Sequence, residues 1–406
     1  MPERRRPQDR SVRGLFDGIV VLLMALGAVV FIEPAPFDLL IIVLLPVALV
    51  LRRLAIPRTS SFALVCVAVF LLSNAVSLPA AHDLKVALRY AAITVYLIIA
   101  WAFVLGLAGK LGERASRQVM LGWAVGALLT TAISIAAYFN LLPLRALLVP
   151  NGRMLGFFKD PNVFGAFLVP PAVWAVARLV SLERGLRAGW ALVLVVCSTG
   201  VFLSYSRGAW ISLAVALLIF FLLRLGGGTT RARVMMLLAV PFAALLLAVA
   251  FERLLEVGSI SEMLEHRLSR QAYDNERFAT QREATEAALR SPLGIGPGQT
   301  ELIFHRAAHN SYVRGFVENG YLGGLSLTAL LFASLLRATW LALALKEPRL
   351  QVAMAVVAAS LAAIAVESLV IDCVHWRHMW LLSALAWTPA LPARDARSSS
   401  RAQLDP

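Results

Sequence analysis

Residues 61–79, SFALVCVAVFLLSNAVSLP, contain no charged side chain. An α-helix rises about 1.5 Å per residue, so a helix of this length can cross the roughly 30 Å hydrocarbon layer of a lipid bilayer. The flanking residues 52–58 and 82–85 are rich in charge. The stretch therefore predicts a membrane-spanning helix whose two ends meet water.

The same pattern recurs along the whole chain. Of its 406 residues, 59% are hydrophobic and 15% are charged, which is more apolar surface than the core of a soluble protein can bury. We therefore predict an all-α, polytopic transmembrane bundle of about 12 helices. The predicted spans cover residues 15–32, 38–54, 61–79, 87–108, 118–139, 162–179, 189–205, 209–225, 232–251, 311–336, 350–369 and 374–391.

The basic residues set the orientation of the predicted bundle. With the N-terminus in the cytoplasm, 23 of the 38 Lys and Arg residues fall in the termini and short loops of the cytoplasmic side, and seven fall in the short loops opposite. Because short Lys- and Arg-rich loops stay in the cytoplasm, both termini are predicted to be cytoplasmic. No small-residue cleavage site follows the first predicted span, so we expect a retained helix. The net charge of +14 thus reflects topology rather than nucleic-acid binding.

One long segment interrupts the spans. We expect residues 1–251 to form nine transmembrane helices and residues 311–392 to form three more. The segment 252–310 between them is predicted to be an extracytoplasmic loop, and residues 393–406 a cytoplasmic tail. The three cysteines lie far apart in or beside apolar segments, with no spacing typical of metal ligands. We interpret them as packing residues and predict no metal site.

The long loop is the water-soluble part of the predicted protein. Its residues 275–290 carry mixed charges at helical i,i+4 spacing, and the run SPLGIGPG at 291–298 breaks that helix. We expect the loop to lie on the membrane surface as a lid.

Four polar clusters fall on the extracytoplasmic side of this topology. The first is GFFKDPN at 156–162, where Asp160 and Asn162 flank Pro161 and can cap the helix that follows. A helix cap next to an interfacial lysine, Lys159, is the structural alternative to a substrate site.

The second and third clusters each present an arginine. SYSRGAW at 204–210 is a tight reversal between two apolar helices with Arg207 at its apex, although an arginine there can simply extend to the interface. The third cluster places Arg277 and Arg282 on the mixed-charge stretch, whose structural alternative is a solvated helix face.

The fourth cluster is HNSYVRGFVENG at 309–320. In water the pKa of His309 would be about 6.5, which leaves the imidazole largely neutral at pH 7 and able to accept a proton. A lone interfacial histidine is nevertheless more often structural. Glu318 lies within a predicted span, where it should pair with a cation or face a polar cavity. A further outer cluster, ranked below these four, consists of His375, Arg377 and His378.

The four clusters occur in the order and approximate spacing of one family. The chain resembles the O-antigen ligase and polymerase superfamily in DPNxF (160–164), SRGAW (206–210), the stretch from Arg277 through PLGIGPG (277–298), and HNSYVRGFVENG (309–320). The resemblance covers residues 156–324. His309 followed by Gly320 is similar to the ligases, whereas related polymerases more often carry Arg at the first position. Gln281 stands where an aromatic residue is common.

The resemblance implies a transferase at the periplasmic face of the bacterial inner membrane. It would move a preassembled polysaccharide from an undecaprenyl diphosphate-linked donor to a sugar of the lipid A core, within membrane lipid and with no cofactor. Arg207 and Arg277 would neutralise the diphosphate leaving group. His309 would deprotonate the acceptor hydroxyl, whose direct attack inverts the anomeric centre. The other side chains expected to contact the substrates are Lys159, Asp160, Asn162, Arg282, Arg306, Asn310, Tyr312, Arg314 and Glu318.

Three other functions stay open at this point. A polymerase of the same superfamily would use a second lipid-linked chain as acceptor. A protein O-glycosyltransferase would use a protein hydroxyl, but such enzymes usually carry a larger C-terminal soluble part. A transporter of lipid or small anions would place ionisable groups near the bilayer midplane, where this sequence places chiefly Glu318 and Glu367.

Overall fold

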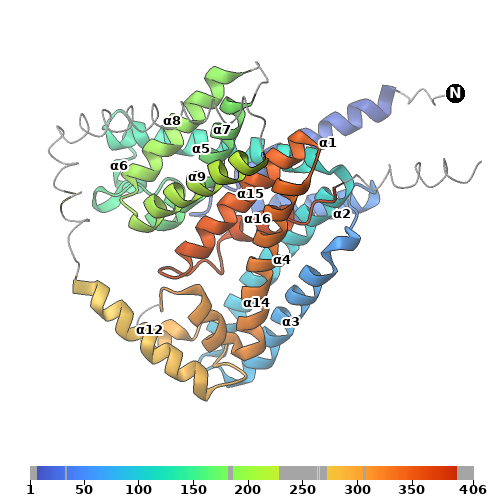
Figure 1. Cartoon of the computed structure of the whole chain (residues 1–406). Coiled ribbons are helices and arrows are strands. Elements are labelled where there is room, and N and C mark those ends of the chain that lie inside the picture. Colours follow the sequence, from blue (N-terminus) through green and yellow to red (C-terminus); the bar gives the residue numbers. More distant parts are fainter. Residues whose placement is uncertain are drawn as a thin grey trace, which may run out of the picture.

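The computed structural model describes residues 7–32, 34–181, 186–227, 263, 265, 272–304 and 308–390 (Figure 1). Every regular element in these ranges is helical. The α-helices are α1 (Pro7–Leu26), α2 (Pro36–Val50), α3 (Ser61–Ser77), α4 (Leu84–Leu111), α5 (Glu113–Tyr138), α6 (Arg145–Leu148), α7 (Pro161–Val180), α8 (Arg187–Leu203), α9 (Arg207–Gly227), α12 (Ala272–Arg290), α13 (Thr300–Phe304), α14 (Ser311–Ala344), α15 (Pro348–Glu367) and α16 (Arg377–Leu385). Short 3-10 helices cover Arg58–Ser60, Leu78–Ala80 and Pro150–Gly152.

Within the described ranges, seven helices are long and apolar enough to cross a membrane. They cover Arg58–Ala80, Leu84–Leu111, Glu113–Tyr138, Pro161–Val180, Arg207–Gly226, Ser311–Ala344 and Pro348–Glu367. Shorter apolar helices occupy Gly14–Leu26, Pro36–Val50 and Arg187–Leu203. The predicted span at 232–251 lies outside the described residues, so the count of twelve stays a prediction. The predicted span at 374–391 contains the nine-residue helix α16, which is too short to cross a bilayer by itself.

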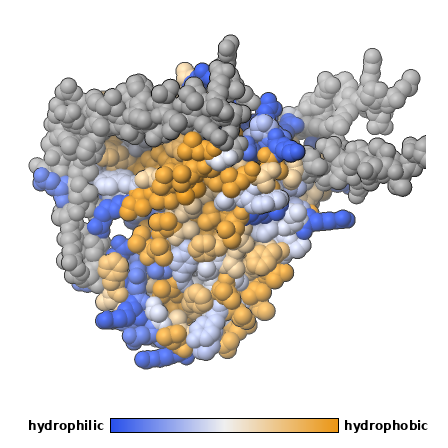
Figure 2. Space-filling view, viewed as in Figure 1, coloured by the Kyte–Doolittle hydropathy of each residue, from blue (hydrophilic) through white to orange (hydrophobic). Residues whose placement is uncertain are grey.

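Helix α15 is the centre of the bundle. It packs against α9 on one side and α14 on the other, and also contacts α7 (Figure 1). Its small side chains allow this close approach, and 83% of its apolar window is buried. Peripheral helices instead expose large apolar side chains such as Ile42 on α2 and Leu218 on α9. Figure 2 shows hydrophobic residues over much of one face, with hydrophilic residues gathered at the lower left where α12 lies. This distribution suits a lipid-facing bundle with one polar end.

Helix α14 is kinked near its start. Gly320 has a φ of +70°, a non-helical conformation that kinks the helix at this residue. The SPLGIGPG run, residues 291–298, forms hydrogen bonds with the helix beside the kink: Ile295 N donates to Val317 O at 2.9 Å, and Gly296 N donates to Glu318 O at 3.0 Å. In return, Tyr321 N donates to Pro292 O at 2.9 Å. Helix α12 ends at Arg290, which confirms that the run breaks that helix. The run also supplies hydrogen-bond partners to the kinked helix α14.

Gly320→Ala is expected to destabilise this junction. A Cβ at Gly320 would lie 2.4 Å from Pro292 O, and the positive φ already disfavours a residue with a side chain. We expect a loss of about 1–3 kcal/mol in the free energy of unfolding, measured by denaturation of the detergent-solubilised protein. Gly189→Ala on α8 is the matched control, because nothing lies within 4 Å of its Cβ. Equal losses in both variants would contradict the expectation.

Candidate functional site

The end of α15 and the turn after it, residues 365–373, join the sequence clusters to one another; we call this stretch the α15 terminal segment. Its backbone carbonyls hold the start of α14. Ser311 N donates to Ser368 O at 2.8 Å, and Asn310 Nδ2 donates to Leu369 O at 3.1 Å. The hydroxyl of Tyr312 donates to Ala365 O at 2.8 Å. The residues that follow His309 are therefore fixed against the central helix of the bundle.

His309 itself lies in the turn before α14. Its φ is +48°, a left-handed conformation that is uncommon for a residue with a side chain and often marks a functional site. Asn310 is the N-cap of α14, and Gln281 Nε2 on α12 donates to His309 O at 3.2 Å. Burial and then the Arg277 guanidinium lower the pKa of His309, against smaller opposite effects of Asp372 and Asp160. The imidazole is therefore neutral at pH 7 and can accept a proton.

Arg277 projects from α12, which packs on α14 (Figure 1). Its guanidinium donates to Val370 O of the α15 terminal segment. Since the same guanidinium lowers the pKa of His309, two of the three predicted catalytic residues lie together. Arg282 is exposed further along the same helix, and Arg306 lies outside the described residues.

Arg207 is the first residue of α9, directly after a strained turn. Tyr205 has a φ of +49°, and Ser206 Oγ accepts a hydrogen bond from Ala209 N at 3.3 Å. The N-terminal part of α9 packs on α15, and Ser212 Oγ donates to Glu367 Oε2 at 2.6 Å. The starts of α9 and α14 therefore meet neighbouring residues of the same segment, and the Arg207 and His309 clusters lie at the same end of the bundle.

The first sequence cluster joins this end through α7. Asp160 is the N-cap of α7, with Oδ1 accepting from Asn162 N at 2.6 Å, which confirms the predicted cap. Arg153 Nη2 donates to Asn162 Oδ1 at 2.9 Å, and its Nε donates to Ser204 O at 3.1 Å. Arg153 thus links the first and second clusters. Lys159 is exposed beside them.

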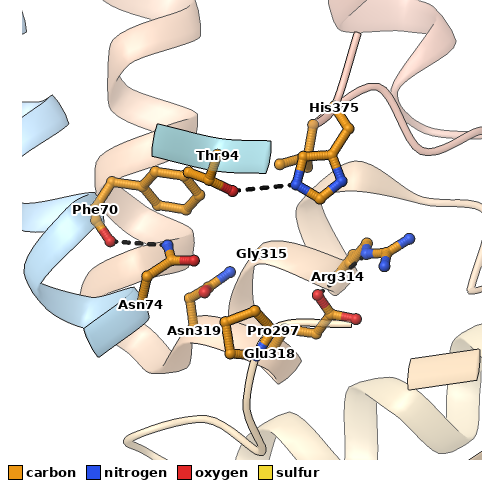
Figure 3. A pocket seen from close by; sticks show the side chains of 10 residues that line it. Phe70, Asn74, Thr94, Pro297, Arg314, Gly315, Glu318, Asn319 and His375 are labelled. Carbon is orange, nitrogen blue, oxygen red and sulfur yellow. Dashed lines mark hydrogen bonds and ion pairs between the residues drawn. The ribbon is translucent and has the colours of Figure 1, made fainter. Parts of the chain in front are cut away.

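Arg314 and Glu318 form a buried ion network (Figure 3). Arg314 contacts three carboxylates: Glu301 at 2.9 Å, Asp372 at 2.5 Å and Glu318 at 3.2 Å. Of the two predicted alternatives for Glu318, a cation or a polar cavity, the first is confirmed by its pairing with Arg314. The Arg314 guanidinium is almost fully buried. Through Glu301 and Asp372 it connects α14 to α13 and to the α15 terminal segment.

Glu318 also clamps the loop that contacts the kinked part of α14. Its carboxylate accepts from Gly298 N at 2.8 Å, from Thr300 N at 3.2 Å and from Thr300 Oγ1 at 2.6 Å. The geometry gives Glu318 a structural task in addition to any contact with substrate.

Glu318→Ala is expected to loosen the loop from α14. The substitution leaves buried donors of Gly298 and Thr300 without their acceptor, which costs about 1–3 kcal/mol for each unsatisfied group. We expect a lower denaturation midpoint and faster proteolysis within 291–304. Glu286→Ala is the control, because Glu286 is exposed and its contact with Arg290 is 4.0 Å long. Unchanged stability and proteolysis in Glu318→Ala would contradict the clamp.

A small polar pocket lies beside this network, between α3, α4 and α14. Figure 3 shows Thr94 and His375 pointing toward one another across it, with Thr94 Oγ1 and His375 Nε2 3.1 Å apart. His375 is half-buried in this pocket. Arg377, grouped with His375 in the sequence, instead pairs with Asp38 at 2.7 Å. The lower-ranked outer cluster of His375, Arg377 and His378 is therefore split between two environments.

Two residues of the site, Arg153 and Asp372, belong to none of the four sequence motifs. Arg153 precedes the first cluster in a predicted outer loop, and Asp372 lies between the predicted spans 350–369 and 374–391. Their roles depend on partners that are 9 to 58 residues away along the chain. No local spacing could have identified them.

The described part of the chain has the make-up of a polytopic membrane protein, all-helical and with seven membrane-length apolar helices. The sequence model of the O-antigen ligase family matches residues 192–328. This match supports the resemblance carried by the three motifs between residues 206 and 320. It includes Arg207, Arg277 and His309, whereas Asp160 and the α15 terminal segment lie outside it. No curated protein matches the chain. The family implies a membrane glycosyltransferase of the ligase and polymerase superfamily that acts on lipid-linked glycans.

Proposed function

We propose that this protein is an O-antigen ligase. It transfers a polysaccharide from undecaprenyl diphosphate to a sugar hydroxyl of the lipid A core, at the periplasmic face of the bacterial inner membrane. The observation that carries the proposal is the placement of neutral His309 beside Arg277, with the start of α9 and its Arg207 fixed to the same α15 terminal segment.

In the proposed reaction, His309 takes the proton of the acceptor hydroxyl as its oxygen bonds to C1 of the donor sugar. The bond from C1 to the diphosphate oxygen breaks, and its electron pair leaves with undecaprenyl diphosphate. Arg207 and Arg277 bind the phosphate oxygens and neutralise the charge that develops there. Because the acceptor attacks directly from the face opposite the leaving group, the anomeric centre is inverted. The protein's own cations supply this stabilisation, and no cofactor enters the proposal.

The remaining predicted contacts divide into two groups. Lys159 and Arg282 are exposed near the site, and together with Arg306 we assign them to the phosphates or the glycan. Asp160, Asn162, Asn310, Tyr312, Arg314 and Glu318 make the capping, hydrogen-bonding and ion-pair contacts described above. We assign these six to holding the substrate-binding surface in shape.

A reconstituted assay tests the proposal. The purified full chain is placed in liposomes with an undecaprenyl diphosphate-linked glycan and lipid A core, in the presence of EDTA. Capped lipopolysaccharide is the expected product. Donor chains that lengthen while lipid A core stays bare would show a polymerase instead, and glycan on a protein acceptor would show protein O-glycosylation. Movement of lipid or solute across the bilayer with no glycan transfer would favour a transporter.

A further inference from the structure

Glu367 is a buried acid that the proposed reaction does not use. It is the last residue of α15, and its side chain is 2% exposed. One carboxylate oxygen accepts from Ser212 Oγ at 2.6 Å. Within the described residues, neither a hydrogen bond to the other oxygen nor an ion pair to the carboxylate is present. Burying a carboxylate with so little compensation is costly, and packing alone would be served better by an apolar residue.

The second oxygen of Glu367 points at the turn that carries Arg207. A Cβ built on Gly208 would lie only 2.9 Å from Glu367 Oε1, so the carboxylate rests against the backbone directly after Arg207. This backbone is the first turn of α9, where unpaired N–H groups and the helix dipole favour a nearby negative charge. Gly208 is the residue type that permits such close approach.

The neighbouring residue completes the connection. Ser368 O accepts from Ser311 N, two residues after His309. Two consecutive residues of the α15 terminal segment, Glu367 and Ser368, therefore hold the helix start that carries Arg207 and the helix start that follows His309. A shift of Glu367 changes the distance between the groups that would bind the diphosphate and take the proton.

We propose that Glu367 is a positioning residue for Arg207, which it holds at the diphosphate site by fixing the first turn of α9 against α15. This inference rests on the proposed glycan transfer. Misplacing a catalytic group by about 1 Å can cost up to about 100-fold in rate. The expected effect of Glu367→Gln is therefore a fall in kcat of about 10- to 100-fold per folded molecule, with the KM for the acceptor unchanged.

The test uses the full chain in liposomes and a double-mutant cycle. Glu367→Gln is measured alone and in an Arg207→Lys background that retains residual transfer. If Glu367 acts through Arg207, the second substitution adds little to the first, whereas independent effects multiply. Glu347→Gln is the matched control: it caps the opposite end of the same helix, with Oε2 accepting from Leu350 N at 2.8 Å, and it should leave kcat unchanged.

A second variant guards against misfolding of Glu367→Gln. Gly208→Ala pushes a Cβ against the same carboxylate oxygen and should lower kcat in the same direction. Multiplicative effects in the cycle, or parental kcat in both Glu367→Gln and Gly208→Ala, would overturn the inference. These outcomes differ from failure of the proposed function, in which the parent protein itself transfers no glycan.

Discussion

Replacement of His309 by alanine is expected to lower the kcat of glycan transfer by about 10²–10⁴-fold, the range typical of a lost general base. The imidazole is neutral and lies beside Arg277, so it can take the acceptor proton where the leaving group is neutralised. Initial rates of capped lipopolysaccharide formation in liposomes measure the effect. His375→Ala is the control, because His375 is half-buried in the polar pocket between α3, α4 and α14 and has no role in the proposed proton transfer. A His309→Ala enzyme with the parental kcat would remove His309 from the mechanism.

The pH dependence of the transfer rate is a second test of the role of His309. Burial and Arg277 lower the pKa of His309, so the protonated, inactive form appears only at more acidic pH than for a free histidine. The rate should therefore rise with pH through a midpoint below about 6.5 and be level at pH 7. If the midpoint of the pH–rate curve lay above 7, a group other than His309 would be the proton acceptor.

Arg207→Ala is the second large effect, with an expected fall in kcat of about 10²–10³-fold. This range is typical of removing one preorganised group that stabilises charge in a transition state. Arg207→Lys should recover part of the loss, because the charge stays while the bidentate geometry is lost. Kinetics with a shortened lipid-linked donor would give kcat and KM separately.

Arg224→Lys is the matched control for Arg207. Arg224 lies near the other end of the same helix, where its Nη1 donates to Gln351 Oε1 at 3.1 Å. Its substitution should leave transfer unchanged. Equal losses at the two positions would indicate damage to α9 rather than loss of a phosphate contact.

Much of this architecture is predictable from local sequence. Apolar length predicts spans such as 61–79, and the position of Asp160 before a helix-starting proline predicts its cap. The cost of a buried charge predicts that Glu318, inside a span, pairs with a cation or faces a polar cavity. In each case the signal lies within one helix and its ends, where spacing along the chain fixes spacing in the structure.

Contacts between segments that are far apart in the sequence could not be predicted. Nothing near Val370 indicates that its carbonyl accepts from Arg277, which lies 93 residues earlier. The kink of α14 at Gly320 depends in the same way on contacts with residues 291–298. Helix α14 has 34 residues and extends beyond the predicted span of 311–336. Such pairings arise from tertiary packing, and a single sequence carries no periodic trace of them.

The exchange of backbone hydrogen bonds between the SPLGIGPG run and α14 has a consequence for protein engineering. A chimera could replace the segment before α14, residues 252–310, with its counterpart from a related protein. A graft that ends at residue 310 would pair a foreign loop with the native Val317, Glu318 and Tyr321 backbone and lose the fit around Gly294 and Gly320. Grafts should therefore extend through residue 321, so that the loop and the helix kink are inherited together.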